Sequence, residues 1–154
     1  MTFSPRHILI ALLIVVPVIV YFLWPTDEAR IKKLIREGAA AIEAEKTDEV
    51  MKKVALHYQD DHGLSYPLLK KGMERLFQQM DKIQIEHDIR VIAVEGEKAT
   101  ADVEVRVIAA FGTDTGYIVG DAGKAQALRL HLEKERAAWL VVRTDGMKAV
   151  IWGQ

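Results

Sequence analysis

The chain has 154 residues, with 21 basic and 22 acidic side chains, a formal net charge of −1 and no cysteine. A charge balance this close to zero provides no net positive potential to attract a phosphate backbone, so nucleic acid is not an expected partner. The lack of cysteine excludes disulfides, thiolate metal sites and a lipid-modified cysteine anchor.

The first predicted element is the apolar run from Ile8 to Trp24, which contains no charged side chain. With its uncharged flanks it has about the ~20 residues that a helix needs to cross ~30 Å of hydrocarbon. Arg6 precedes the run, and a short basic tail favours a cytoplasmic amino terminus. We therefore predict a cytoplasmic tail and transmembrane signal anchor over residues 1–26. The anchor makes a single pass through the inner or plasma membrane and leaves residues 27–154 as one extracytoplasmic domain. Cleavage of the run as a secretory signal is the alternative.

Three helices are predicted after the anchor. The first runs from Asp27 to about Glu45, and a short second one starts near Thr47 and ends in the polar turn Asp60-Asp61-His62-Gly63. The third has Pro67 in its first turn and the clearest apolar stripe at steps of three and four residues. This stripe consists of Leu68, Leu69, Gly72, Met73, Leu76, Phe77 and Met80.

From Lys82 onward the apolar period changes to two, which predicts long antiparallel strands. The alternating residues of the first two strands are Ile83, Ile85, His87, Ile89, Val91 and Ala93, and then Ala99, Ala101, Val103, Val105 and Val107. The glycine-rich stretch 111–123 is interpreted as a long flexible hairpin connection. A third strand follows around Leu128 to Leu132. The fourth starts near Ala138, and a kink or turn at 144–146 precedes 148–152. The predicted fold class is α+β, with three helices packed on a curved four-stranded sheet.

Short segments along the whole domain carry a resemblance to a known superfamily. They are Ala39-Ala40-Ala41-Ile42-Glu43-Ala44, the turn Asp60-Asp61-His62-Gly63, the hairpin Glu95-Gly96-Glu97-Lys98-Ala99 and the segment Ala138-Trp139-Leu140-Val141. In their order and spacing they resemble the nuclear-transport-factor-2-like superfamily, which includes ketosteroid isomerases, scytalone dehydratases and polyketide cyclases. The resemblance implies a cone-shaped fold and pairing as a homodimer through the open sheet face. It does not specify an activity, because this fold hosts enzymes, binding modules and scaffolds.

Candidate site residues come from the turn and the strands. His87 and His131 lie in predicted strands, and if both point to the concave side near Tyr58 and Asp60, they form convergent polar groups in an apolar cavity. A core or rim histidine is the simpler interpretation of each. The isomerases of the superfamily use an aspartate base with a tyrosine and a protonated acid. That set has no counterpart that we can place here, so catalytic residues stay unassigned.

No metal or cofactor is expected, because the His57, Asp60, Asp61 and His62 cluster matches no zinc spacing. The sequence therefore favours a membrane-anchored extracytoplasmic binding module without catalysis, which holds a small apolar ligand or an envelope protein. The alternative is a membrane-tethered isomerase, dehydratase or hydrolase. A deep pocket with Tyr58, Asp60 or His87 converging inside favours the enzyme. A filled cone with an apolar outer sheet face favours the interaction module.

Overall fold

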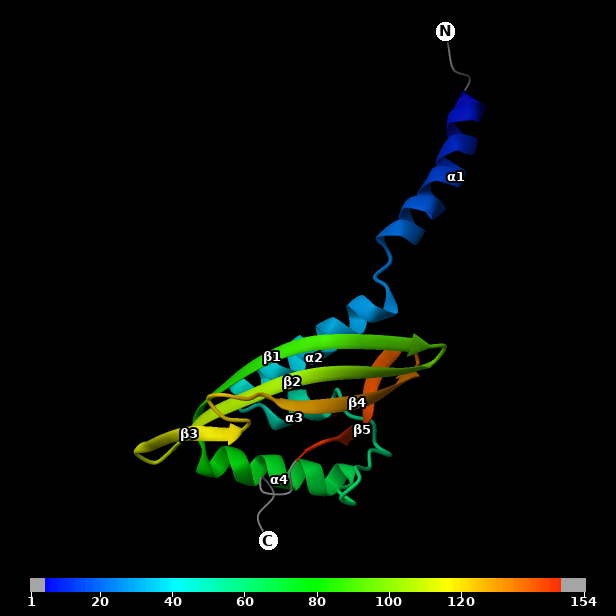
Figure 1. The fold of residues 1–154 in the computed structure, drawn as a ribbon. Helices are drawn as coiled ribbons and strands as arrows, with labels where there is room; N and C mark the ends of the chain where they lie inside the picture. The colour runs from blue at the N-terminus through cyan, green and yellow to red at the C-terminus, as the bar shows by residue number, and fades with distance from the viewer. Residues whose placement is uncertain (1–4, 148–154) are drawn as a thin grey trace.

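The computed structural model describes residues 5–147, with side chains from Leu9 onward, and within this range it has four helices and five antiparallel strands. The helices are α1 (Pro5–Leu23), α2 (Asp27–Glu43), α3 (Thr47–Met51) and α4 (Tyr66–Gln79). The strands are β1 (Asp81–Glu95), β2 (Lys98–Phe111), β3 (Asp114–Val119), β4 (Gln126–Glu135) and β5 (Ala138–Asp145). The sheet curves around the remaining helices, whereas α1 projects away from the body (Figure 1). The α+β class is confirmed, and the predicted segment 148–152 lies outside the described residues.

From Leu9 onward, the projecting helix α1 is apolar on all sides. Every side chain from Leu9 to Leu23 is exposed. Among the described residues, no single helix is both long and apolar enough to cross a membrane. The stretch Leu9–Leu23 reaches the required length only together with α2, and the two helices are bent by 44° at their junction. The predicted single-helix span is therefore not shown by the structure.

Helix α2 begins where the sequence indicates. The Thr26 hydroxyl accepts a hydrogen bond from the backbone N–H of Ala29 at 3.2 Å, as an N-cap residue does. Asp27, the first helical residue, accepts hydrogen bonds from Lys134 Nζ at 2.9 Å and Trp139 Nε1 at 3.0 Å. These bonds tie the start of α2 to β4 and β5. The helix buries Ile31 against the inner face of the sheet.

The stretch predicted as a flexible connection contains strand β3. The sheet therefore has five strands rather than the predicted four. The hydrogen-bonded order is β1-β2-β4-β5, and β3 pairs with the far end of β2. Strand β2 is longer than its partner β4, so its backbone beyond Val105 needs other hydrogen-bonding groups, which β3 supplies. The apolar residues of this stretch, Ile118 and Val119, face the interior.

The predicted alternation of inward and outward residues in β1 is interrupted by a β-bulge. The pairing register with β2 shifts between Ile89 and Val91. Residues before the shift face the helices at odd positions, but beyond it Ile92 packs on the core and Val91 is 56% exposed. One extra residue turns every later side chain to the opposite face, which a period-two pattern does not reveal.

The second predicted helix is shorter than expected. Helix α3 ends at Met51, and the chain then passes through turns while hydrogen-bonding to the edge of β5. The backbone N–H of Ala55 donates to Val141 O at 3.0 Å, and that of Gln59 donates to Val142 O at 3.1 Å. This edge pairing fixes Tyr58 against the interior, where it is 5% exposed.

The two faces of the sheet differ in character. The inner face carries the core, with Leu132 and Trp139 packed on α2. The outer face carries cross-strand ion pairs, of which Asp102 with Arg129 is bidentate at 2.6 and 2.9 Å. Further pairs on this face are Arg90–Glu104, Arg106–Glu86, His131–Asp145 and Arg143–Asp145. The outer face is therefore charged and internally paired rather than apolar.

Candidate functional site

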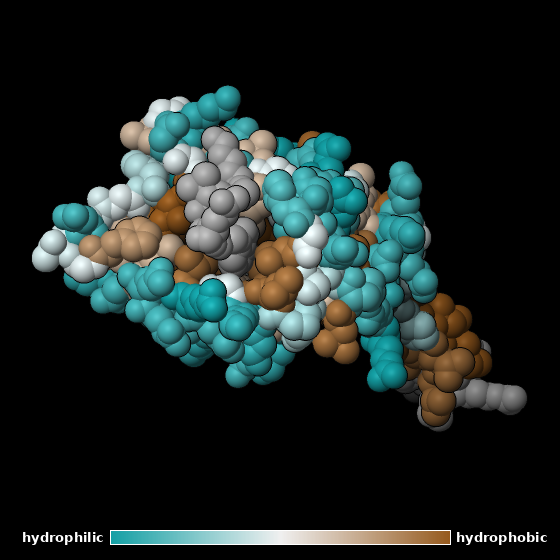
Figure 2. Space-filling model, turned by 90° about the horizontal axis from the view of Figure 1, so that it is seen from below, coloured by the Kyte–Doolittle hydropathy of each residue, from teal (hydrophilic) through white to brown (hydrophobic). Residues whose placement is uncertain are grey.

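A cavity of about 290 Å³ lies between the helices and the inner face of the sheet. This volume is at the lower end of the ~300–1,000 Å³ typical of small-molecule sites. Its walls come from α2, α4, the segment that follows α3, and the inward side chains of all five strands. Within the described residues, the polar side chains of the wall are Lys53, Tyr58, His87 and Thr144. Figure 2 shows apolar side chains gathered between polar ones on the underside of the domain, and the apolar surface of α1 projecting from it.

Tyr58 is one of two buried residues of the described cavity wall that carry a hydroxyl, the other being Thr144. Its side chain lies near that of Thr144, which lines the same wall. Burial raises the pKa of the Tyr58 hydroxyl above its ordinary value, and the carboxylates of Asp60, Asp61 and Asp145 add to the rise, whereas the neighbouring Thr144 hydroxyl opposes it. The phenol is therefore neutral at physiological pH. It can orient a polar atom of a ligand but not act as a base.

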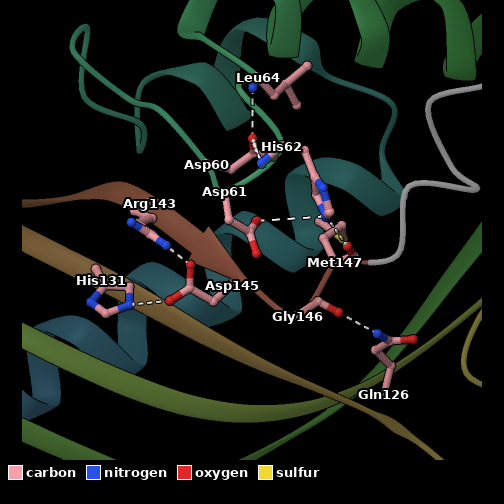
Figure 3. Close-up of polar contacts among 10 residues, drawn as sticks. All are labelled: Asp60, Asp61, His62, Leu64, Gln126, His131, Arg143, Asp145, Gly146 and Met147. Atoms are coloured by element: carbon pink, nitrogen blue, oxygen red, sulfur yellow. Dashed lines mark hydrogen bonds and ion pairs between the residues drawn. The ribbon is translucent and has the colours of Figure 1, made fainter.

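Asp60 is buried, with 7% of its surface exposed, but its carboxylate does not line the cavity. Its Oδ1 accepts hydrogen bonds from the backbone N–H groups of His62 at 2.9 Å and Leu64 at 2.7 Å (Figure 3). This is the Asx-turn pattern, in which a short side chain closes a turn through backbone amides. Asp60 therefore shapes the turn that follows Tyr58.

His87 lines the cavity from β1. It stands at an odd position before the bulge, so its ring faces the helices together with the side chains of Ile83 and Ile85. The ring also borders a second, more open groove beside α2. Tyr58 and His87 are thus the two predicted site residues that the fold brings to one cavity.

His131 lies on the outer face of the sheet. Its Nε2 is 2.7 Å from Asp145 Oδ2, and Asp145 Oδ1 accepts from Arg143 Nε at 2.6 Å (Figure 3). The Arg143 hydrogen bond, followed by the His131 hydrogen bond, holds the pKa of the Asp145 carboxyl below its usual value. The inward side chains of β4 are leucines, so His131 does not converge with His87.

Two wall residues are not among the predicted site residues. The sequence predicts a kink or turn at Thr144, but a register shift in the β4–β5 pairing after His131 turns it inward. Lys53 contributes its aliphatic stem to the wall while its Nζ pairs with Glu37 Oε2 at 2.6 Å. Neither has a sequence signal, because both depend on how β5 pairs with its neighbours.

Within the described part of the chain, no three histidine or carboxylate side chains are arranged to hold a metal ion. The chemistry available at the cavity wall is therefore one neutral phenol with a neighbouring threonine, one imidazole and one lysine stem in apolar surroundings.

Comparison of the sequence with protein-family models and with curated proteins found no match. Solved structures do match. A Novosphingobium aromaticivorans protein provisionally named as a scytalone dehydratase has a TM-score of 0.67 at 12% identity, over 77% of this chain and 80% of that one. The fold is nuclear-transport-factor-2-like.

Two further matches agree. A provisionally named aromatic ring hydroxylase from the same organism has a TM-score of 0.62 at 15% identity, over 77% of this chain and 85% of that one. A Mycobacterium tuberculosis protein of unknown function has a TM-score of 0.61 at 14% identity, over 75% and 67%. Identities this low show the fold alone, and the fold hosts many activities. The predicted resemblance is confirmed at the level of the fold.

Proposed function

We propose that the nuclear-transport-factor-2-like domain binds a small apolar ligand in its cavity without transforming it, and that α1 holds the domain at a membrane. The observation that carries the binding role is the composition of the cavity wall. A mostly apolar cavity with a few convergent polar groups is the usual form of a ligand site. Here the Tyr58–Thr144 pair and His87 are the groups that orient the ligand.

The wall composition argues against proton-transfer chemistry of the ketosteroid isomerase kind. Such chemistry needs a carboxylate base within reach of the reacting carbon. Among the described residues that line the cavity, none is an aspartate or a glutamate. The nearby buried carboxylate of Asp60 is already held by two backbone amides. Binding is therefore the better-supported role.

Two features favour a ligand over an envelope protein as the occupant. The cone is hollow rather than filled, and its outer sheet face carries paired charges rather than apolar side chains. A partner on that face would have to desolvate these ion pairs, at a cost that the contacts must offset. A homodimer through the sheet face, like an envelope protein partner, stays a prediction.

The membrane role rests on α1. A helix that is apolar all round is normally buried in protein or lipid, yet here its side chains from Leu9 onward are exposed. Arg6, which precedes the apolar run, favours a cytoplasmic start, which would leave the domain on the extracytoplasmic side. Because the chain has no cysteine, a single Leu56→Cys variant tests this side. An impermeant maleimide should label it from outside, and labelling only after lysis would reverse the orientation.

Neutral ligand binding is tested on the full chain in lipid nanodiscs with a photo-activated, diazirine-bearing decanol. The matched variants are Ala39→Phe, which fills the cavity, and Ala40→Phe, on the exposed neighbouring position of α2. We expect cross-links in β2 and α4, reduced about tenfold in Ala39→Phe and unchanged in Ala40→Phe. Cross-links confined to α1, or equal in both variants, would contradict the proposal.

The second candidate function is an enzyme of the isomerase, dehydratase or hydrolase type. It is favoured by the neutral phenol of Tyr58 and the imidazole of His87 on one cavity, and by the enzyme-like names of two similar structures. Exchange of solvent deuterium into a small cyclic ketone, lost in His87→Ala, would support catalysis. If the wild-type chain shows no exchange, this enzyme candidate is contradicted and binding is the proposed role that is left.

A further inference from the structure

A second groove, of about 360 Å³, runs beside the apolar cavity between α2 and the edge strand β1. Unlike the cavity, it is lined mostly by polar residues. Its walls are Ala29, Lys32, Arg36, His87, Asp88 and Ile89. His87 lines both spaces, so the apolar cavity and the polar groove share this residue as a common wall.

The groove carries cations available to an anion. Lys32 and Arg36 are four residues apart on α2, so both point to the same side of the helix. Lys32 Nζ pairs with Glu28 at 2.7 Å, but both side chains are half exposed, and such a pair contributes little. Within the described residues, no carboxylate oxygen lies within 4.0 Å of an Arg36 nitrogen. The carboxylate of the groove, Asp88, is engaged by Arg90 Nη1 at 3.1 Å.

From this arrangement we propose that the ligand is a single-chain amphiphile with an anionic head. Its chain occupies the cavity and its head lies in the groove against Lys32, Arg36 and His87. This inference rests on the proposed binding function and names the ligand class. A guanidinium presents a fork of donors that matches a carboxylate or a phosphate, and the lysine and imidazole add further donors. A cationic head would be repelled by the same two side chains.

The cavity volume sets the size of the apolar part. At about 290 Å³ the cavity is near the lower limit for small-molecule sites. A single chain of medium length suits such a volume, whereas the two chains of a bilayer lipid do not. Ten-carbon compounds are therefore suitable probes, because their chains are nearly equal in length and they differ mainly in the head group.

The test uses the full chain in lipid nanodiscs with the neutral diazirine-bearing decanol as label. Decanoate, decyl phosphate, decanol and decyltrimethylammonium compete with the label at neutral pH. The variants are Arg36→Gln and Lys32→Gln, with Lys33→Gln as the matched control. Lys33 is the neighbouring lysine on α2, it pairs with Glu37, and it does not line the groove. Each competitor is compared between variant and wild type, so its partition into lipid cancels.

We expect one or both anionic competitors to lose about tenfold in potency in Arg36→Gln and a smaller factor in Lys32→Gln, as the loss of a charge-assisted hydrogen bond predicts. Decanol should compete equally in every variant, and Lys33→Gln should match the wild type. A response to decanoate alone identifies a carboxylate head, and a response to decyl phosphate alone identifies a phosphate head.

Several outcomes would overturn the inference. Equal potency of decanoate, decyl phosphate and decanol in all variants would show that the protein does not recognise the head group. An equal loss in Lys33→Gln and Arg36→Gln would show a general effect of helix charge. In both cases the neutral label still reaches the cavity, so the proposed binding function survives. If the label does not reach the cavity of the wild-type chain, both the proposed binding function and the inferred ligand class are overturned.

Discussion

Tyr58 and Thr144 form a polar pair inside an otherwise apolar cavity. Removing one partner of a buried hydrogen bond leaves the other unsatisfied, whereas removing both with side chains of the same shape is nearly neutral. We therefore expect Tyr58→Phe to lower the free energy of unfolding by about 1–2 kcal/mol. The double variant Tyr58→Phe/Thr144→Val should recover part of this loss.

The measurement for this pair is urea unfolding of the single and double variants, compared as a double-mutant cycle. Strictly additive losses would mean that the two hydroxyls act independently and that no hydrogen bond between them contributes. Thr144→Val alone completes the cycle.

The two strand histidines show how much one position decides. His87 and His131 each alternate with apolar residues, so the pattern within each strand allows both to face the cavity. In β1 the odd residues, His87 included, are the inward ones, whereas in β4 the leucines on either side of His131 take the interior. His131 is left to pair with Asp145 on the outer face. Leu130 and Leu132 beside His131 were the sequence signal for this outcome.

Among the elements, α2 depends on Asp27 for its position. This carboxylate joins the helix start to Lys134 of β4 and Trp139 of β5. The Lys134 hydrogen bond, and after it that of Trp139, lowers the pKa of the Asp27 carboxyl. A folded-state pKa below the unfolded value of about 3.9 means that the bond stabilises the fold above that pH. This stabilisation is lost as the pH falls through the folded-state pKa.

Asp27→Asn should therefore lower the free energy of unfolding by about 1–2 kcal/mol at neutral pH, because its amide replaces a charge-assisted acceptor of a partly exposed pair. The difference from the wild type should shrink as the pH falls below about 4. Denaturant unfolding at a series of pH values measures this. Glu28→Gln, at the next position of α2, is the control and should cost less than about 0.5 kcal/mol, because its pair with Lys32 is half exposed. A constant difference at all pH values would contradict the assignment.

The strands illustrate a second effect at the scale of elements. The length of β2 beyond β4 creates the demand for β3, and the bulge after Ile89 turns the end of β1 over. Both effects arise from pairing between strands. A pattern within one strand carries no information about either of them.

At the scale of the whole molecule, we expect the exposed apolar surface of α1 to decide whether the chain associates with a membrane. We predict that the intact chain stays in the membrane fraction at high pH and that Val16→Arg releases it. Placing an arginine mid-helix in hydrocarbon costs about 2.5–3.5 kcal/mol on the insertion scale. Carbonate extraction followed by sedimentation measures the distribution.

The control for this prediction is Leu56→Arg, which places the same charge at an 81% exposed apolar residue of the domain. It should leave the distribution unchanged. Wild-type protein washed free by carbonate would remove α1 from its proposed role. Equal retention of Val16→Arg would show that the membrane contact lies elsewhere.

The sequence by itself determined the α+β class, the order of the elements other than β3 and the likeness to the nuclear-transport-factor-2-like fold. These follow from local patterns: helical stripes before Met80 and period-two alternation after Lys82, with caps and turns such as Thr26 and Gly96 between them. Tyr58 and His87 also proved to lie where the cavity forms, because the positions of the segment after α3 and of β1 follow from the same order.

Only the tertiary structure decided which side chains share the cavity. The path of the segment after α3, the bulge in β1 and the register shift in β5 depend on hydrogen bonds between segments far apart in the chain. Those shifts turn Thr144 inward and Val91 outward. The wall at His87 that the cavity shares with the groove of Lys32 and Arg36 has the same origin, since it exists only because α2 packs beside the edge strand β1. A one-residue change in pairing exchanges the two faces of a strand, and no local pattern records it.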